Sequence, residues 1–164
     1  METRFDQCVN KFLFTYNLIF RVETTCDDET GNVLQSRISF WTRDKNQKEI
    51  GYIQSDISRN NQIILFDAIM KNFHNLTFLK IGIIYLLLTY GKKYNIQKLS
   101  LSANPHHDNL ELCLHCYYQK IGFRQIPGTA IKVDGNRFIS QLEMDANPKK
   151  LIKYLEHDIQ KLCS

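Results

Sequence analysis

The stretch that decides the fold is Leu112-Cys-Leu-His-Cys-Tyr-Tyr-Gln-Lys-Ile-Gly-Phe123. Its apolar side chains recur at helical spacing, which predicts a helix with one apolar face, and Gly122 is a typical stop signal for that helix. The aromatic residue that follows begins a strand. Tyr118 stands one helical turn before the glycine, so we expect its phenol at the exposed C-terminal end of the helix, where it could meet a ligand at the adjacent strand edge.

The chain before this run is dominated by strand-like segments. β-Branched and aromatic residues separated by polar turns predict strands at Lys11–Thr25, Val33–Arg43, Glu49–Ile57 and Gln62–Met70. These four segments should form an antiparallel meander. The turn at 27–32 is short, so the first two strands are expected to form a hairpin.

The pattern then changes from strands to alternating helices and strands. The apolar stretch Phe78–Tyr94 is too long and continuous for a strand and predicts a largely buried helix, followed by a short strand at Lys98–Ala103. The helix of the opening run is expected over Asn109–Lys120, and further strands at Phe123–Ile126 and Phe138–Met144.

The C-terminal segment, 148–164, predicts an amphipathic helix from Pro148 to Leu162. A strand–helix–strand crossover brings parallel strands into one sheet, so the meander should continue into a mixed sheet flanked by helices. The predicted fold class is therefore α+β (mixed α/β), in a single domain over residues 1–164. The apolar face of the C-terminal helix could cover the sheet or serve a homodimer.

Composition narrows the function classes. The chain has 164 residues and a net charge of +4, which favours an anionic ligand such as a nucleotide phosphate but falls short of a nucleic-acid-binding signature. The most apolar stretch, Ile81–Leu88, is shorter than the roughly 20 residues that a membrane span needs. Five cysteines without framework spacing and an N-terminus without an apolar signal region predict free thiols and a cytoplasmic location.

A cluster of possible metal ligands, Cys113, His115 and Cys116, lies on the opening run. On a helix the two cysteines share a face while the histidine points elsewhere, so the three side chains cannot easily converge on one ion. We therefore expect buried thiols and no metal site.

The order of elements resembles that of the GCN5-related N-acetyltransferase (GNAT) fold. Tyr118, followed four residues later by Gly122-Phe123, resembles the signature of that family, and the resemblance covers roughly Glu49 to Met144. It implies transfer of an acyl group from acetyl-coenzyme A to an amine, by direct attack and without a metal.

The resemblance also implies where the cofactor binds. In the family, the loop before the first helix and the N-terminal amides of that helix hold the pyrophosphate. The family pattern there is Arg or Gln, two residues, Gly, one residue, then Gly or Ala. On this chain only Gly82 matches, and Lys80 could supply a point charge in place of arginine. The expected cofactor-binding residues are Leu79, Lys80, Ile81, Gly82, Ile83 and Ile84. The same glycine could instead allow close helix packing.

By the same resemblance, Tyr118 corresponds to the general acid that returns a proton to the coenzyme A sulfur. The amine must be neutral to attack, and Asp67 is the first candidate for the base. The alternatives are Glu111, His106 and His107. Both residues could instead have purely structural roles, Tyr118 as a core residue at a helix end and Asp67 as a solvated strand residue.

Two departures from the family suggest a second hypothesis. Leu79 and Ile84 break the phosphate-loop pattern, and the turn at 27–32 leaves no room for the helices that usually wall the acceptor pocket. A non-catalytic GNAT-like domain, acting as a protein-binding or regulatory module, is therefore the alternative to an enzyme.

Overall fold

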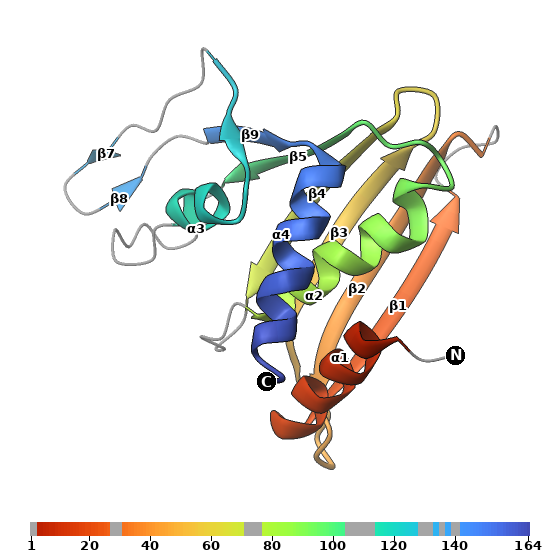
Figure 1. Cartoon of the computed structure of the whole chain (residues 1–164), viewed down its shortest axis with the longest axis vertical. Coiled ribbons are helices and arrows are strands. Elements are labelled where there is room, and N and C mark those ends of the chain that lie inside the picture. Colours follow the sequence, from red (N-terminus) through yellow and green to blue (C-terminus); the bar gives the residue numbers. More distant parts are fainter. Residues whose placement is uncertain are drawn as a thin grey trace.

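A seven-stranded mixed sheet forms the body of the molecule (Figure 1). The computed structural model describes residues 3–26, 31–70, 77–103, 114–127, 133–134, 137–138 and 142–164. The strand order is β1-β2-β3-β4-β5-β9-β6, and β7 and β8 form a separate pair. The strands are β1 (Leu18–Cys26), β2 (Val33–Thr42), β3 (Glu49–Ser58), β4 (Ile63–Met70), β5 (Lys98–Ala103), β6 (Arg124–Gln125), β7 (Val133–Asp134), β8 (Arg137–Phe138) and β9 (Leu142–Ala146).

Strands β1 to β4 form the antiparallel meander that the sequence predicts, and β4 pairs parallel with β5. The crossover between these two contains α2 (Thr77–Leu86), so the expected mixed α+β sheet is confirmed. The helices α1 (Arg4–Thr15) and α4 (Pro148–Lys161) lie with α2 over one face of the sheet (Figure 1). The short helix α3 (Leu114–Lys120) lies beside them, at the end of the sheet that holds β5 and β9.

The core lies between this helical layer and the sheet. Ile38, Ile53 and Ile64 come from three adjacent strands and are fully enclosed beneath the helices. A Cβ atom at Gly82 of α2 would lie only 2.3 Å from Cδ1 of Ile53, so a glycine is needed for the helix to approach β3. This geometry supports the packing interpretation of Gly82.

Helix α1 was not expected, and the prediction of a strand from Lys11 is wrong, because the chain is helical to Thr15 and β1 begins only at Leu18. A capping box starts the helix: Thr3 Oγ accepts a hydrogen bond from the Asp6 N–H, and the Asp6 carboxylate accepts one from the Thr3 N–H. The side of α1 that faces the core is formed by Phe5, Cys8 and Leu13, whereas the aromatic residue Phe14 is exposed.

The long apolar helix predicted from Phe78 to Tyr94 is present but changes its winding. It is α-helical to Leu86 and continues as a π-helical turn, Leu87–Gly91. The chain then leaves the helix at Asn95, whose φ is +50°.

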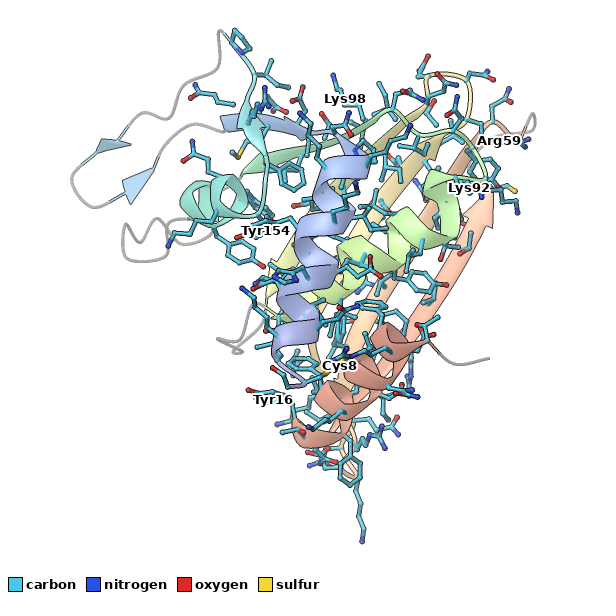
Figure 2. All side chains as sticks on the ribbon, in the orientation of Figure 1. Cys8, Tyr16, Arg59, Lys92, Lys98 and Tyr154 are labelled. Atoms are coloured by element: carbon cyan, nitrogen blue, oxygen red, sulfur yellow. A yellow bond between two sulfur atoms is a disulfide. The ribbon has the colours of Figure 1, made fainter. Side chains whose placement is uncertain are left out.

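Two cysteines correct the expectation of free thiols. Cys8 on α1 and Cys163, just after α4, form a disulfide with 5.6 Å between their Cα atoms (Figure 2). Cys26 is free and exposed, whereas Cys113 and the side chain of Cys116 lie outside the described residues. In the part of the chain that is described, no helix combines the length and apolarity needed to cross a membrane.

Candidate active site

Strands β4 and β5 part at their carboxyl ends. Their parallel pairing runs only from Ile63 opposite Lys98 to Phe66 opposite Leu101. Beyond that point β4 stays paired with β3 to Met70, and β5 stays paired with β9 to its end. A gap therefore opens between the two strands, with helix α2 starting beyond the end of β4. Crevices at the carboxyl ends of parallel strands are common ligand sites in α/β proteins.

A cavity of about 530 Å³ lies at this gap, a size suited to a small molecule. Phe66 and Leu101, from the side of the sheet that carries the helices, line it together with Leu65 and Ser100, from the opposite side. Most of its described lining residues lie on the face of the sheet away from the helices, and the cavity borders the point where β4 and β5 part. The described residues that line it are Gln35, Tyr52, Gln54, Ser55, Asp56, Leu65, Phe66, Asp67, Ser100, Leu101 and Glu143.

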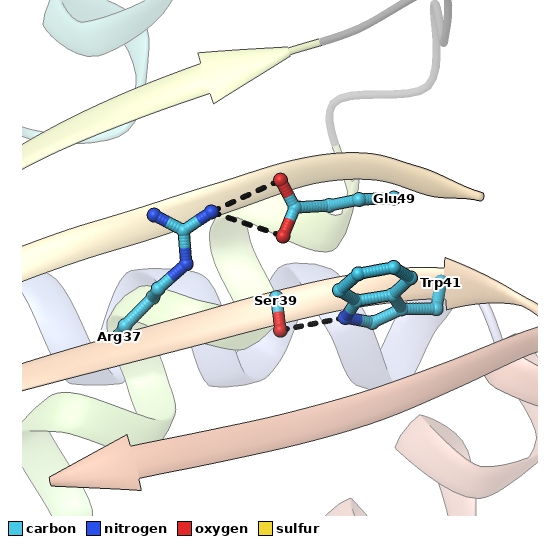
Figure 3. A network of polar contacts seen from close by, with 4 residues as sticks. All are labelled: Arg37, Ser39, Trp41 and Glu49. Atoms are coloured by element: carbon cyan, nitrogen blue, oxygen red, sulfur yellow. Dashed lines mark hydrogen bonds and ion pairs between the residues drawn. The ribbon is translucent and has the colours of Figure 1, made fainter. Parts of the chain in front are cut away.

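The lining is acidic. Among the described residues it contains the carboxylates of Asp56, Asp67 and Glu143 and no lysine, arginine or histidine. Two basic residues on strands of the same sheet, Arg37 and Lys98, form ion pairs with carboxylates that do not line the cavity. Arg37 Nη2 lies 3.0 Å from both carboxylate oxygens of Glu49 (Figure 3), and Lys98 pairs with a carboxylate outside the lining. The cavity thus carries negative charge in a chain whose net charge is +4.

An aromatic and polar network holds Arg37 in place at the edge of the cavity. Its guanidinium lies 3.6 Å from the ring centroid of Tyr52, which lines the cavity. Beside it, Trp41 Nε1 donates a hydrogen bond to Ser39 Oγ (Figure 3). The ion pair with Glu49 and the ring contact with Tyr52 together hold the Arg37 guanidinium at the edge of the cavity.

Tyr118 is buried rather than exposed, which corrects the expectation drawn from its position before Gly122. Its side chain is 4% exposed, because its ring packs edge-to-face against Phe66 and Phe123, with centroids 6.2 and 5.5 Å away. The predicted helix stop itself is confirmed: Gly122 has a φ of +115°, and the N–H of Phe123 donates to the carbonyl of Tyr118.

The two predicted catalytic residues lie near one another. Burial raises the pKa of the Tyr118 phenol, and the negative charge of Asp67 raises this pKa further. Phe66 stands between them, since it lines the cavity with Asp67 and packs against Tyr118.

The Tyr118 hydroxyl makes no hydrogen bond to a group that the structure describes. Ser36 Oγ is the one described side-chain polar atom that is both fully enclosed and without a partner. The hydroxyl of Tyr118 is therefore not among the fully enclosed atoms without a partner, although its ring is buried.

The predicted cofactor residues do not gather at the cavity. Leu79, Ile81, Gly82, Ile83 and Ile84 are all buried in the core, and none of them lines the cavity. From residue 81 onward the N–H groups of α2 donate to carbonyls four residues back, so Gly82 and Ile84 offer no amide to a phosphate.

Lys80 is the one predicted cofactor residue that is only partly buried. Its ammonium forms an ion pair and hydrogen bond with Asp158 of α4. Burial lowers the pKa of Lys80, although the carboxylate opposite favours its charged form. The charge of Lys80 is therefore used in an ion pair that joins α2 to α4.

The remaining expectations concern the alternative bases, His115 and the connection between the first two strands. The alternative bases Glu111, His106 and His107, and the side chain of His115, lie outside them. Strands β1 and β2 pair directly as far as Cys26 opposite Leu34.

Sequence reasoning missed Asp56, Glu143 and Ser100. Each comes from a different strand, β3, β9 or β5, so only the pairing register brings them together. A usable signal was present in β3, where Tyr52, Gln54 and Asp56 alternate with buried residues and mark a polar face.

Comparisons with known proteins give a structural likeness. No protein-family model matches the sequence, and no curated protein does. The dodecameric spermidine N-acetyltransferase of Vibrio cholerae in an intermediate state aligns with a TM-score of 0.51 at 16% identity, over 71% of this chain and 66% of that one. A GNAT-family acetyltransferase of Staphylococcus aureus Mu50 aligns with a TM-score of 0.48 at 18% identity, over 70% and 68% of the two chains. The chain therefore has a GNAT-like fold, similar at low sequence identity to that of known acetyltransferases.

Proposed function

We propose that this protein is an N-acyltransferase that moves an acetyl or related acyl group from coenzyme A to an amine. The observation that supports the proposal is the gap between β4 and β5, with Asp67 at the cavity and Tyr118 close enough to Asp67 for its charge to raise the tyrosine pKa. The GNAT-like fold suggests the reaction class, and the negative cavity suits a cationic amine better than an anionic acceptor.

The gap fits a thioester carrier better than the α2 residues do. Beyond Phe66, the backbone edge of β4 that faces away from β3 has no strand opposite it in the described part of the chain. An extended, amide-containing chain such as the pantetheine arm of coenzyme A could pair with this edge as an added strand. The side chains of Leu79 to Ile84 are enclosed or paired, so any phosphate contact is expected from the backbone N–H groups of the first turn of α2 or from other residues.

In this reaction Asp67 and Tyr118 carry out different proton transfers. Asp67 accepts a proton from the ammonium group of the acceptor, which leaves the neutral amine that attack requires. The amine nitrogen attacks the thioester carbonyl, the carbon–nitrogen bond forms, and the carbon–sulfur bond breaks as the tetrahedral intermediate collapses. The Tyr118 hydroxyl donates its proton to the leaving sulfur and takes the remaining nitrogen proton, so that no phenolate is left. Its raised pKa keeps it protonated beforehand.

The test is the release of free thiol from acetyl-coenzyme A in the presence of a panel of amines. We expect amine-dependent release by the wild type, a decrease of about a hundredfold or more in turnover for Asp67→Asn, and a decrease for Tyr118→Phe with unchanged affinity for acetyl-coenzyme A. Equal turnover of Tyr118→Phe and wild type would remove the acid role. Coenzyme A binding without thiol release for any amine would contradict catalysis.

One observation favours the alternative, a non-catalytic module. The segment expected to bind phosphate is part of the core, and Lys80 is paired with Asp158. Replacing Ile84 by glycine would not separate the two functions, because this fully buried side chain contributes roughly 2–5 kcal/mol to stability. Direct measurement of acetyl-coenzyme A binding separates them: the alternative predicts none.

A further inference from the structure

We propose that the acceptor is a small linear amine with at least two positive charges, held in the cavity by Asp56 and Asp67. This inference rests on the proposed function, because it identifies the substrate class of the same site. It goes beyond that function by requiring a second ammonium group that does not react.

The first argument is the charge of the cavity. Among the described residues, no lysine, arginine or histidine forms an ion pair with Asp56 or Asp67, although the chain as a whole is basic. The nearby Arg37 is already neutralised by Glu49. Carboxylates left without cations at a cavity favour a ligand that supplies the positive charge itself.

The second argument is the hydroxyl group of Ser100. This residue lines the cavity, is only 6% exposed, and makes no side-chain hydrogen bond to any group that the structure describes. A hydroxyl group at the wall of a cavity can form a hydrogen bond with a ligand there. The Ser100 oxygen could accept a hydrogen bond from an N–H group of such a ligand.

The third argument is the apolar surface between the charges. Leu65 lies directly opposite Asp56 on one side and Ser100 on the other, two residues before Asp67 in the same strand. Its side chain is 52% exposed, so it offers a hydrocarbon surface at the cavity. A ligand with an alkyl middle and charged ends would cover this surface, whereas a compact divalent metal ion would not.

The spacing of the carboxylates agrees with a linear chain. Asp56 and Asp67 lie on adjacent strands and are offset by two residues, so their Cα atoms are separated by roughly 8 Å from the dimensions of a sheet. With Asp67 at the reacting nitrogen, Asp56 is placed to hold a second ammonium group one alkyl spacer away.

The experiment compares putrescine with n-butylamine, which has the same carbon chain but one ammonium group. Calorimetry measures the binding of each amine to the wild type, to Asp56→Asn, and to Glu156→Gln as a control that removes one negative charge on α4, on the other side of the sheet. We expect putrescine to bind at least about fivefold more tightly than n-butylamine, the size of one partly exposed ionic contact. Asp56→Asn should remove this preference, and Glu156→Gln should keep it.

Several results would overturn the proposal. They are equal affinities of the two amines for the wild type, an unchanged preference in Asp56→Asn with an unchanged thermal unfolding midpoint, or displacement of putrescine by Mg²⁺ at equal concentration. Thiol release from acetyl-coenzyme A distinguishes the two levels of the argument. Acetylation of both amines with equal efficiency would refute the diamine preference and keep the acyltransferase. Putrescine binding that depends on Asp56, without any thiol release, would keep the diamine preference and refute the acyltransferase.

Discussion

Replacement of Gly82 by alanine tests whether this residue serves packing or phosphate binding. The new methyl group would lie 2.3 Å from Cδ1 of Ile53, well inside contact distance, and Ile53 is fully buried. Overpacking of this kind costs about 1–3 kcal/mol, and the better helix propensity of alanine offsets about 1 kcal/mol of it. We expect Gly82→Ala to lower the free energy of unfolding by about 1–2 kcal/mol.

The double variant with Ile53→Val makes the prediction specific. Valine lacks the Cδ1 atom that the new methyl group meets, so in this background Gly82→Ala should be neutral or stabilising. Urea denaturation of the wild type, both single variants and the double variant should give a coupling energy of about 2 kcal/mol, well above the scatter seen for independent sites. Additive effects would refute the packing explanation and return Gly82 to the list of phosphate-binding candidates.

Three further predictions concern stability. The disulfide between Cys8 and Cys163 closes a loop over a sequence separation of 155 residues, so Cys8→Ser should lower the free energy of unfolding by up to about 5 kcal/mol, and thermal unfolding with and without reductant checks this. Ser36 Oγ is enclosed without a partner, so Ser36→Ala should leave stability unchanged or raise it by about 1 kcal/mol in urea denaturation, and a clear loss would show that the hydroxyl is satisfied. Hydrogen bonds from Thr3 lower the pKa of the Asp6 carboxyl below its ordinary value of 3.8. The stability that these bonds provide is present above that pH and is lost as the pH falls through the folded-state pKa, so Asp6→Asn should flatten the acid limb of a plot of stability against pH. An unchanged acid limb would exclude the capping box as a contributor.

The sheet was largely predictable because its signals are local. Alternation of polar and apolar residues located β2 to β4, and β5 was predicted with its observed bounds, Lys98–Ala103. The change to a long apolar segment identified the crossover helix α2, from which the mixed sheet follows. Helix α1 was missed because its aromatic residues imitate a strand, although the spacing of Thr3 and Asp6 carried a capping signal.

The site was predictable only in part, because it depends on tertiary packing. Asp67 and Tyr118 were identified by resemblance, but the aromatic neighbours that bury Tyr118 come from β4 and from the residue after Gly122. The cavity joins side chains of five strands, and the sequence does not contain the register that aligns Asp56, Leu65 and Ser100. The splitting of β4 from β5, on which the proposed function depends, likewise has no local signature.

Calorimetric titration of the protein with acetyl-coenzyme A tests the central claim most directly. The gap between β4 and β5 predicts one binding site per chain, with an affinity that survives Tyr118→Phe because the hydroxyl acts on the leaving sulfur rather than in binding. The absence of any binding heat at near-millimolar acetyl-coenzyme A would contradict the acyltransferase and favour the non-catalytic module.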